Sequence, residues 1–255
     1  MAKVSIATLD QAKRAEPPAN ATGDIESRSY FNAESDPLHL LWHRLSPHAE
    51  LVITGEPADR LAYVLSGSIE ADGITLSAKS SAITEFGASL RVRAGAEGAT
   101  VLLFNVQKRR PDDREGHHVH LLPTENVPRS ASFHGSEGIG GGLHADAQCP
   151  TCRVWLHEQS YAMENKETAL HSHSEDEIIF VTDGTIRIGQ RIYGPGTALA
   201  IAANVKYGFF SGPGGLQFIN FRGSSPTYTS ADGATVLDEA QLWRSALGSP
   251  MYTAP

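Results

Sequence analysis

The sequence predicts an all-β protein with two tandem copies of one β domain and a short helix near its C-terminal end. Its periodic segments are short, rich in β-branched and aromatic residues, and separated by turn signals such as Asp183-Gly184. This pattern is typical of β-sandwiches and β-barrels. In addition, the chain matches itself at a fixed shift, and one stretch near its end has helical spacing.

The clearest predicted strands occur in both halves of the chain. They are 61–65, 100–104, 177–181 and 216–221. The helix is predicted over 235–247, where Leu237, Ala240 and Trp243 have the spacing of one helical face.

An internal repeat relates the two halves. At a shift of 117 residues, 54–104 aligns with 171–221 without a gap, and Gly67 falls on Gly184. Such matches carry weight because few other residues suit the backbone conformations of tight turns.

The repeat divides the chain into three parts. A shift of 115 also aligns the segments that begin at Val4 and Val119, which start the two copies. We expect an N-terminal domain over 1–110, a C-terminal domain over 116–226 and an extension over 227–255, with a polar linker between the domains.

Composition excludes several classes of partner. The 255 residues include 21 Lys and Arg against 29 Asp and Glu, a formal net charge of −8, with no basic block. This balance argues against nucleic-acid and anionic-membrane partners. No apolar run approaches the ~18 residues of a membrane-spanning helix, and the first residues lack the apolar stretch of a signal peptide. We therefore expect a cytoplasmic protein.

The two cysteines form one Cys149-Pro-Thr-Cys152 motif. A single CxxC is half of a zinc site or a redox pair. No second CxxC follows, and no βαβ pattern surrounds it, so we expect two reduced thiols in the cytoplasm. An alternative is a zinc site that includes His144 and needs a fourth ligand from elsewhere.

A second group of ligand-type residues lies in the C-terminal copy. His171 and His173 are two residues apart, so in a strand their side chains point to the same face. Glu177 begins the next apolar run and is expected to meet them across a hairpin. Two imidazoles and one carboxylate form the ligand set of a divalent transition metal, with positions left open for substrate and oxygen.

The spacing of these residues resembles the first motif of the cupins, G(X)5HXH(X)3–4E(X)6G. His171, His173, Glu177 and Gly184 match it, whereas the leading glycine is absent. The resemblance implies a jelly-roll β-barrel with the metal in its mouth and, because of the repeat, a bicupin with two such barrels. A homodimer is also implied by this resemblance.

The second cupin motif is degenerate here. In its looser form it matches 196–209, with Ala202 in place of proline and Tyr207 in place of the last histidine ligand. Tyr207 would then be an acid, base or hydrogen-bond donor beside a three-ligand site, a phenolate ligand, or the mark of a decaying site. We favour the open three-ligand site with Tyr207 in a catalytic role.

The first copy keeps the aligned strands and turn glycines but not the ligand residues. The positions of His171, His173, Glu177 and Tyr207 are occupied there by Thr54, Glu56, Arg60 and Leu90. We therefore expect a structural role for the N-terminal domain.

The substrate pocket is expected to be lined by apolar residues in phase with the ligands. These are Ile179, Phe209 and, from the opening strand, Trp155.

The resemblance implies a metal-dependent enzyme that acts on a small organic molecule. With Fe(II) favoured as the ion, the activity would be that of a non-heme dioxygenase. Two alternatives remain open. One is an isomerase, lyase or cyclase that uses Zn(II), Mn(II) or Ni(II) as a Lewis acid. The other is a non-catalytic small-molecule-binding cupin.

Overall fold

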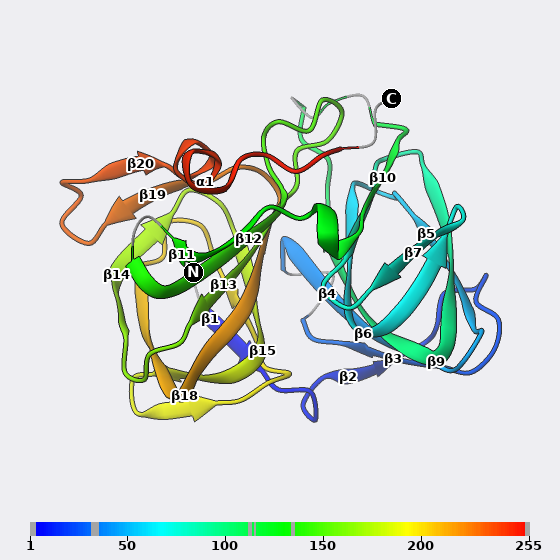
Figure 1. Cartoon of the computed structure of the whole chain (residues 1–255), viewed down its shortest axis with the longest axis horizontal. Helices are drawn as coiled ribbons and strands as arrows, with labels where there is room; N and C mark the ends of the chain where they lie inside the picture. Colours follow the sequence, from blue (N-terminus) through cyan, green and yellow to red (C-terminus); the bar gives the residue numbers. More distant parts are fainter. Residues whose placement is uncertain (1–3, 32–35, 112–113, 115, 134–135, 253–255) are drawn as a thin grey trace. The chain divides into compact units, whose positions relative to one another are not determined.

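The computed structural model describes residues 4–31, 36–111, 114, 116–133 and 136–252, and most of them lie in β-strands, as predicted. The chain forms two compact units, each with a sheet of its own (Figure 1). We call them the N-terminal barrel (Asp10–Val127, Cys149–Arg153 and Pro250–Pro255) and the C-terminal barrel (Met1–Leu9, Pro128–Gln148 and Val154–Ser249).

The described part of the N-terminal barrel has an antiparallel sheet with the main order β10-β8-β6-β9-β4-β3-β2; β5 pairs with β9 and β7 with β6. A 3-10 turn, η1, follows the last strand at Thr124–Asn126. The strands are β2 (Lys13–Ala15), β3 (Ile25–Ser29), β4 (Leu38–Leu45), β5 (Glu50–Thr54), β6 (Arg60–Ala71), β7 (Ile74–Ser77), β8 (Ser81–Thr84), β9 (Ser89–Val106) and β10 (Val119–Leu122).

The described part of the C-terminal barrel has the corresponding order β1-β17-β15-β18-β13-β12-β11, to which β14, β16, β19 and β20 are joined. Its helix, α1, spans Glu239–Leu247. The strands are β1 (Val4–Ala7), β11 (Arg129–Phe133), β12 (Ser136–Ala145), β13 (Trp155–Tyr161), β14 (Glu167–His173), β15 (Glu177–Ile188), β16 (Arg191–Tyr193), β17 (Ala198–Ile201), β18 (Tyr207–Arg222), β19 (Thr227–Ser230) and β20 (Val236–Asp238).

The strand bounds follow the internal repeat. β6 and β15 begin and end 117 residues apart, and so do β8 and β17. The first strands of the two copies are exchanged, because β1 pairs with β17 of the C-terminal barrel and β10 pairs with β8 of the N-terminal barrel. The domain bounds expected from the sequence, 1–110 and 116–226, instead place β1 in the N-terminal domain and β10 in the C-terminal domain.

Each barrel is filled by the inward-facing residues of its strands. In the N-terminal barrel the core includes Leu51, Leu90 and Val101, all at most 1% exposed. In the C-terminal barrel it includes Ile179 and Leu216, also at most 1% exposed. This burial accounts for the alternating apolar residues from which the strands were predicted.

The C-terminal extension begins with strands and ends in a helix shorter than predicted. β20 occupies Val236–Asp238, so α1 begins at Glu239 rather than at 235. The Asp238 side chain accepts a hydrogen bond from the backbone N–H of Gln241 and thereby caps the helix. Ala240 and Trp243 are buried as expected, whereas Leu237 precedes the helix and is 39% exposed.

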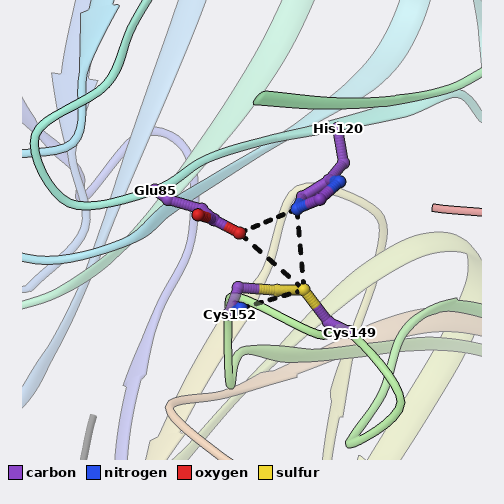
Figure 2. A group of neighbouring side chains, drawn as sticks. All are labelled: Glu85, His120, Cys149 and Cys152. Atoms are coloured by element: carbon purple, nitrogen blue, oxygen red, sulfur yellow. Dashed lines mark hydrogen bonds and ion pairs between the residues drawn. A yellow bond between two sulfur atoms is a disulfide. The ribbon is translucent and has the colours of Figure 1, made fainter. Parts of the chain in front are cut away.

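The prediction of two reduced thiols is wrong for this structure. Cys149 and Cys152 form a disulfide, and no other cysteine exists in the chain (Figure 2). Among the described residues, no helix combines the length and the apolar character needed to cross a lipid bilayer.

A buried histidine in the N-terminal barrel gives the first testable prediction. His43 on β4 is 1% exposed, and its Nδ1 lies 2.8 Å from Oγ of Ser27. Burial, helped by the positive charge of Arg60, lowers the pKa of His43 from 6.5 to about 4. The folded barrel therefore holds this imidazole in its neutral form.

We expect the free energy of unfolding to fall as the pH drops from 6.5 towards 4. In that window the unfolded chain binds a proton at His43 that the folded chain does not bind, which costs up to about 3 kcal/mol. Above pH 6.5 the His43 imidazole is neutral in both the folded and the unfolded chain, so its contribution to the pH dependence vanishes. Urea unfolding at several pH values should show a shallower loss in His43→Asn than in the wild type. Equal pH slopes in the two proteins would contradict the prediction.

Candidate functional site

The C-terminal barrel encloses a cavity of about 160 Å³. Aromatic rings form much of its wall, and His171, His173, Asn220, Arg222 and Glu239 supply its polar groups. A cavity with apolar walls and a few convergent polar groups is typical of a small-molecule site.

Strand β14 brings the two predicted histidines together. His171 and His173 are 4% and 5% exposed, and their ring centroids lie 4.8 Å apart. Nδ1 of His171 lies 2.6 Å from the carbonyl oxygen of Ala169, which only accepts hydrogen bonds. Nδ1 of His171 therefore carries the proton, and Nε2 presents its lone pair. Burial lowers the pKa of His171, which favours this neutral ring.

His173 has a carboxylate as its neighbour. Its Nδ1 lies 3.1 Å from Oε1 of Glu239, outside regular hydrogen-bond geometry. Glu239 is the first residue of α1 and is 6% exposed. Histidines that bind metals commonly direct their second ring nitrogen at a carbonyl or carboxylate in this way.

Glu177, the third predicted ligand, is held by two side chains of β18. Its Oε2 accepts hydrogen bonds from Nδ2 of Asn220 at 2.7 Å and from Nη2 and Nε of Arg222 at 2.7 and 3.1 Å. The antiparallel register of β15 and β18 produces this arrangement, since Glu177 is the direct partner of Arg222. The carboxylate is 2% exposed, so these hydrogen bonds replace its hydration.

Arg222 joins two carboxylates. Its Nη1 donates to Oε2 of Glu239 at 2.8 Å, while Nη2 and Nε hold Glu177. Burial alone would raise the pKa of both carboxyls, but the charge of Arg222, together with hydrogen bonds and the neighbouring histidines, outweighs it. The pKa of Glu177 is lowered, and that of Glu239 falls to about 2. Arg222 thus holds two ionised carboxylates close to His171 and His173.

Tyr207 lies beside this cluster and is neutral. Burial, followed by the negative charge of Glu177, raises the pKa of the Tyr207 phenol well above 10.0. A neutral phenol can donate a hydrogen bond, whereas a phenolate ligand would require the proton to be lost.

Two of the three expected pocket residues line the cavity. Ile179 and Phe209 belong to its wall. Trp155 does not, because it is fully buried in an aromatic cluster with Trp243. Its indole N–H donates to Nδ1 of His157 at 2.8 Å, and His157 is the residue that faces the cavity.

Sequence reasoning missed several residues of the site, among them Asn220, Arg222, Tyr228 and Glu239. The ring of Tyr228 stacks on His171 at a centroid distance of 5.0 Å. A signal for Arg222 existed, since a charged residue ends the apolar run 216–221. No comparable signal marked Glu239, because its burial depends on where α1 packs.

In the N-terminal barrel the equivalent positions do not converge on a comparable site. Glu56 is exposed and Leu90 is part of the apolar core. These placements agree with the loss of ligand types in the first copy.

His171, His173 and Glu177 carry the donor types that bind a divalent metal ion, but Glu177 is not part of the cavity wall and the three ligand atoms do not all lie within 4.8 Å of one another. Each histidine directs Nδ1 at an oxygen acceptor and leaves Nε2 for an ion, and Glu177 supplies a carboxylate. The competing contact is the ion pair of Glu177 with Arg222, which involves only one carboxylate oxygen.

Comparison with solved structures establishes the fold. Protein Ylba from E. coli matches with a TM-score of 0.67 and 14% identity, over 87% of this chain and 90% of that chain. The E162A mutant of Bacillus subtilis oxalate decarboxylase matches with a TM-score of 0.67 and 14% identity, over 91% and 80%.

A further match is the formate complex of Lactobacillus farciminis oxalate decarboxylase, with a TM-score of 0.67 and 12% identity over 89% of this chain and 88% of that chain. No family model and no curated protein matches the sequence. The predicted all-β fold of jelly-roll barrels is therefore confirmed, and the identities are too low for the matches to show more than the fold.

Proposed function

We propose that this protein is a metal-dependent enzyme that acts on a small organic molecule in the cavity of its C-terminal barrel. The ion would be held by Nε2 of His171, Nε2 of His173 and the carboxylate of Glu177. The observation that carries the proposal is the orientation of the two histidines, whose Nδ1 atoms face Ala169 and Glu239. This orientation prepares both rings for an ion on their other side.

Two histidines and one carboxylate are the ligand set of non-heme Fe(II) oxygenases, so we favour a dioxygenase. Bound Fe(II) supplies one-electron chemistry with O₂ and open positions for substrate. The aromatic wall around His171, including Tyr228 and Phe209, excludes water and orients an apolar substrate. The neutral Tyr207 phenol, at the same wall, would donate a hydrogen bond to a bound substrate.

The neutral phenol also favours a second candidate. A Zn(II), Mn(II) or Ni(II) ion at the same residues would polarise a substrate oxygen, and Tyr207 would then be placed to supply a proton. Isomerase, lyase or cyclase chemistry would follow. The likeness to oxalate decarboxylases is compatible with such a reaction on a small organic acid.

The test begins with metal content. His173→Ala should contain about one metal ion per chain less than the wild type, measured by inductively coupled plasma mass spectrometry. Ser172→Ala is the matched control, because it lies on the same strand with its side chain on the opposite face. Loss of metal in both variants, or in neither, would contradict the assignment.

The identity of the metal and the uptake of O₂ then separate the two candidates. An iron-containing protein that consumes O₂ with a candidate diketone, phenol or thiol supports the dioxygenase. A bound metal without O₂ uptake supports Lewis-acid chemistry. Absence of metal after anaerobic reconstitution would replace both by a non-catalytic binding role.

A further inference from the structure

A second cluster of ligand-type side chains lies in the N-terminal barrel. Glu85, His120, Cys149 and Cys152 place one potential ligand atom each within 4.8 Å of all the others (Figure 2). Each of the four residues is at most 1% exposed. They come from three separate segments of the chain, and the compact unit that contains them includes Cys149–Arg153.

The exchanged strand β10 positions two of these residues. It pairs with β8, so His120 lies opposite Ile83 and the backbone N–H of Glu85 donates to the carbonyl of His118 at 3.0 Å. Glu85 and Ile83 are two residues apart and point to the same face as His120. The side chains of Glu85 and His120 therefore meet, with Nε2 and Oε1 2.7 Å apart.

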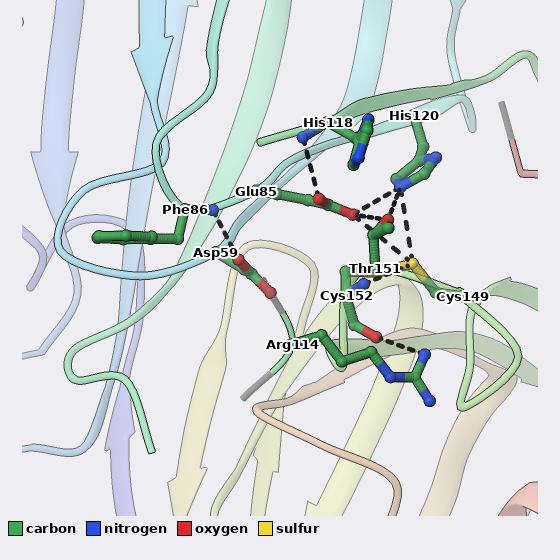
Figure 3. Close-up of polar contacts among 9 residues, drawn as sticks. All are labelled: Asp59, Glu85, Phe86, Arg114, His118, His120, Cys149, Thr151 and Cys152. Atoms are coloured by element: carbon green, nitrogen blue, oxygen red, sulfur yellow. Dashed lines mark hydrogen bonds and ion pairs between the residues drawn. A yellow bond between two sulfur atoms is a disulfide. The ribbon is translucent and has the colours of Figure 1, made fainter. Parts of the chain in front are cut away.

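Further hydrogen bonds fix the cluster (Figure 3). Oε2 of Glu85 accepts from the backbone N–H of His118 at 3.0 Å, and Oε1 accepts from the Thr151 hydroxyl at 2.5 Å. Sγ of Cys149 accepts from the backbone N–H of Cys152 at 3.0 Å. Donors that point at a carboxylate and at a sulfur stabilise negative charge on both atoms.

The distances approach those of a tetrahedral zinc site. With the usual bond lengths for zinc, a tetrahedron places sulfur roughly 3.6 Å from nitrogen or oxygen ligands. Sγ of Cys149 lies 3.6 Å from Nε2 of His120 and 3.9 Å from Oε1 of Glu85. In the same tetrahedron the nitrogen and oxygen lie roughly 3.3 Å apart, so the imidazole and carboxylate, now 2.7 Å apart, must separate by more than half an ångström. The two sulfurs must also be unlinked and move to roughly 3.7 Å from each other.

Burial argues against a catalytic redox pair. A dithiol that exchanges with partner proteins must be accessible, whereas Cys149 and Cys152 are 0% and 1% exposed. A closed group of four protein ligands is instead typical of structural zinc. The Glu85 side chain is contacted by His120, Thr151, Cys149 and the backbone of His118, and a bound cation would add positive charge beside this buried carboxylate.

We propose that Glu85, His120, Cys149 and Cys152 bind a structural Zn²⁺ ion when the disulfide is reduced, and that the disulfide is the metal-free form of the same site. A dithiol reductant supplies two electrons and two protons, the S–S bond breaks to two thiols, and the reductant becomes a cyclic disulfide. Zn²⁺ then displaces two thiol protons and binds two thiolates, one imidazole and one carboxylate.

The test uses Co²⁺ as a spectroscopic substitute for zinc. The whole chain, reduced and kept anaerobic, should bind Co²⁺ with thiolate-to-cobalt charge-transfer absorption and the intense visible bands of tetrahedral cobalt. Because the chain has only two cysteines, this absorption reports Cys149 and Cys152 alone and is independent of the cavity in the C-terminal barrel. Added Zn²⁺ should remove it, and the oxidised protein should never show it.

Variants then test the two other ligands. His120→Gln and Glu85→Gln should each weaken Zn²⁺ binding by at least about tenfold. Loss of a residue that only hydrogen-bonds a metal ligand already costs about tenfold or more in affinity, and loss of a ligand should cost no less. His118→Gln is the matched control and should bind zinc like the wild type, since only its backbone contacts Glu85. Circular dichroism identifies any variant that fails to fold. The comparison of oxidised with reduced wild-type protein tests the site without any substitution.

Two results would overturn the proposal. One is a reduced, folded wild-type protein that binds Co²⁺ without thiolate charge-transfer absorption. The other is a charge-transfer band and zinc affinity that remain unchanged in His120→Gln and Glu85→Gln, which would show binding by the two sulfurs alone.

Discussion

Arg222→Met is expected to destabilise the C-terminal barrel by about 3–5 kcal/mol, the usual effect of removing one partner from a buried ion pair. Arg222 is 1% exposed and bonds to Glu177 and Glu239, which are 2% and 6% exposed. Methionine fills much of the same volume but leaves two buried carboxylates without their counter-charge. Urea unfolding near neutral pH measures the loss.

The pH dependence of this loss gives a sharper test. Without Arg222, burial dominates and the pKa values of Glu177 and Glu239 should rise above those in the unfolded chain. Protonation then favours the folded variant, so its deficit relative to the wild type should shrink as the pH falls towards about 4. A pH-independent deficit would show that lost packing, rather than unpaired charge, causes the destabilisation.

A second substitution and a control complete this experiment. Adding Glu239→Gln to Arg222→Met removes one unpaired charge and should restore part of the stability. The control is Arg191→Met, because Arg191 on β16 is exposed and such surface substitutions usually change stability by less than about 0.5 kcal/mol. Similar losses in Arg222→Met and Arg191→Met would refute the role assigned to Arg222.

The sequence predicted those parts of the fold that depend on local pattern. Alternating apolar residues and turn glycines identified the strands, and the 117-residue shift matched the bounds of β6 with those of β15. Local pattern could not predict with which strand the first strand of each copy pairs. β8 and β17 are equivalent edges with the same local pattern, so only the path of the whole chain determines which one β1 and β10 join.

The candidate site shows the same division. His171, His173 and Glu177 could be proposed as a group because their spacing along the chain sets their faces in neighbouring strands. Glu239 was missed because it meets His173 through the packing of α1, which depends on contacts far apart in sequence. For the same reason Glu85 was not connected with the cysteines, since it lies 64 residues before Cys149.

Gly184→Ala is expected to destabilise the C-terminal barrel by about 2–5 kcal/mol. Gly184 has a φ of +65°, which is unfavourable for alanine by about 1–2 kcal/mol. A Cβ atom there would also clash with the carbonyl oxygen of Gly215 and lie 2.8 Å from its carbonyl carbon. This overlap should destabilise the folded state by about 1–3 kcal/mol more, because the backbone of β18 must move to make room.

Gly189→Ala separates the two contributions. Gly189 has a similar φ of +58°, but a Cβ atom there would have no neighbour within 4 Å. It should therefore lose only the conformational part, about 1–2 kcal/mol. In the N-terminal barrel, Gly67→Ala and Gly73→Ala form the corresponding pair, since a Cβ on Gly67 would clash with the Gly98 carbonyl while Gly73 is open.

Urea unfolding of the four variants should show a larger loss for Gly184 than for Gly189 and, independently, for Gly67 than for Gly73. That outcome would explain physically why Gly67 and Gly184 match in the repeat: β6 and β15 each pass a neighbouring backbone so closely that no side chain fits. Equal losses of unfolding free energy within each pair would mean that the backbones of β9 and β18 move aside at little cost. The glycines would then be required only for their backbone conformation.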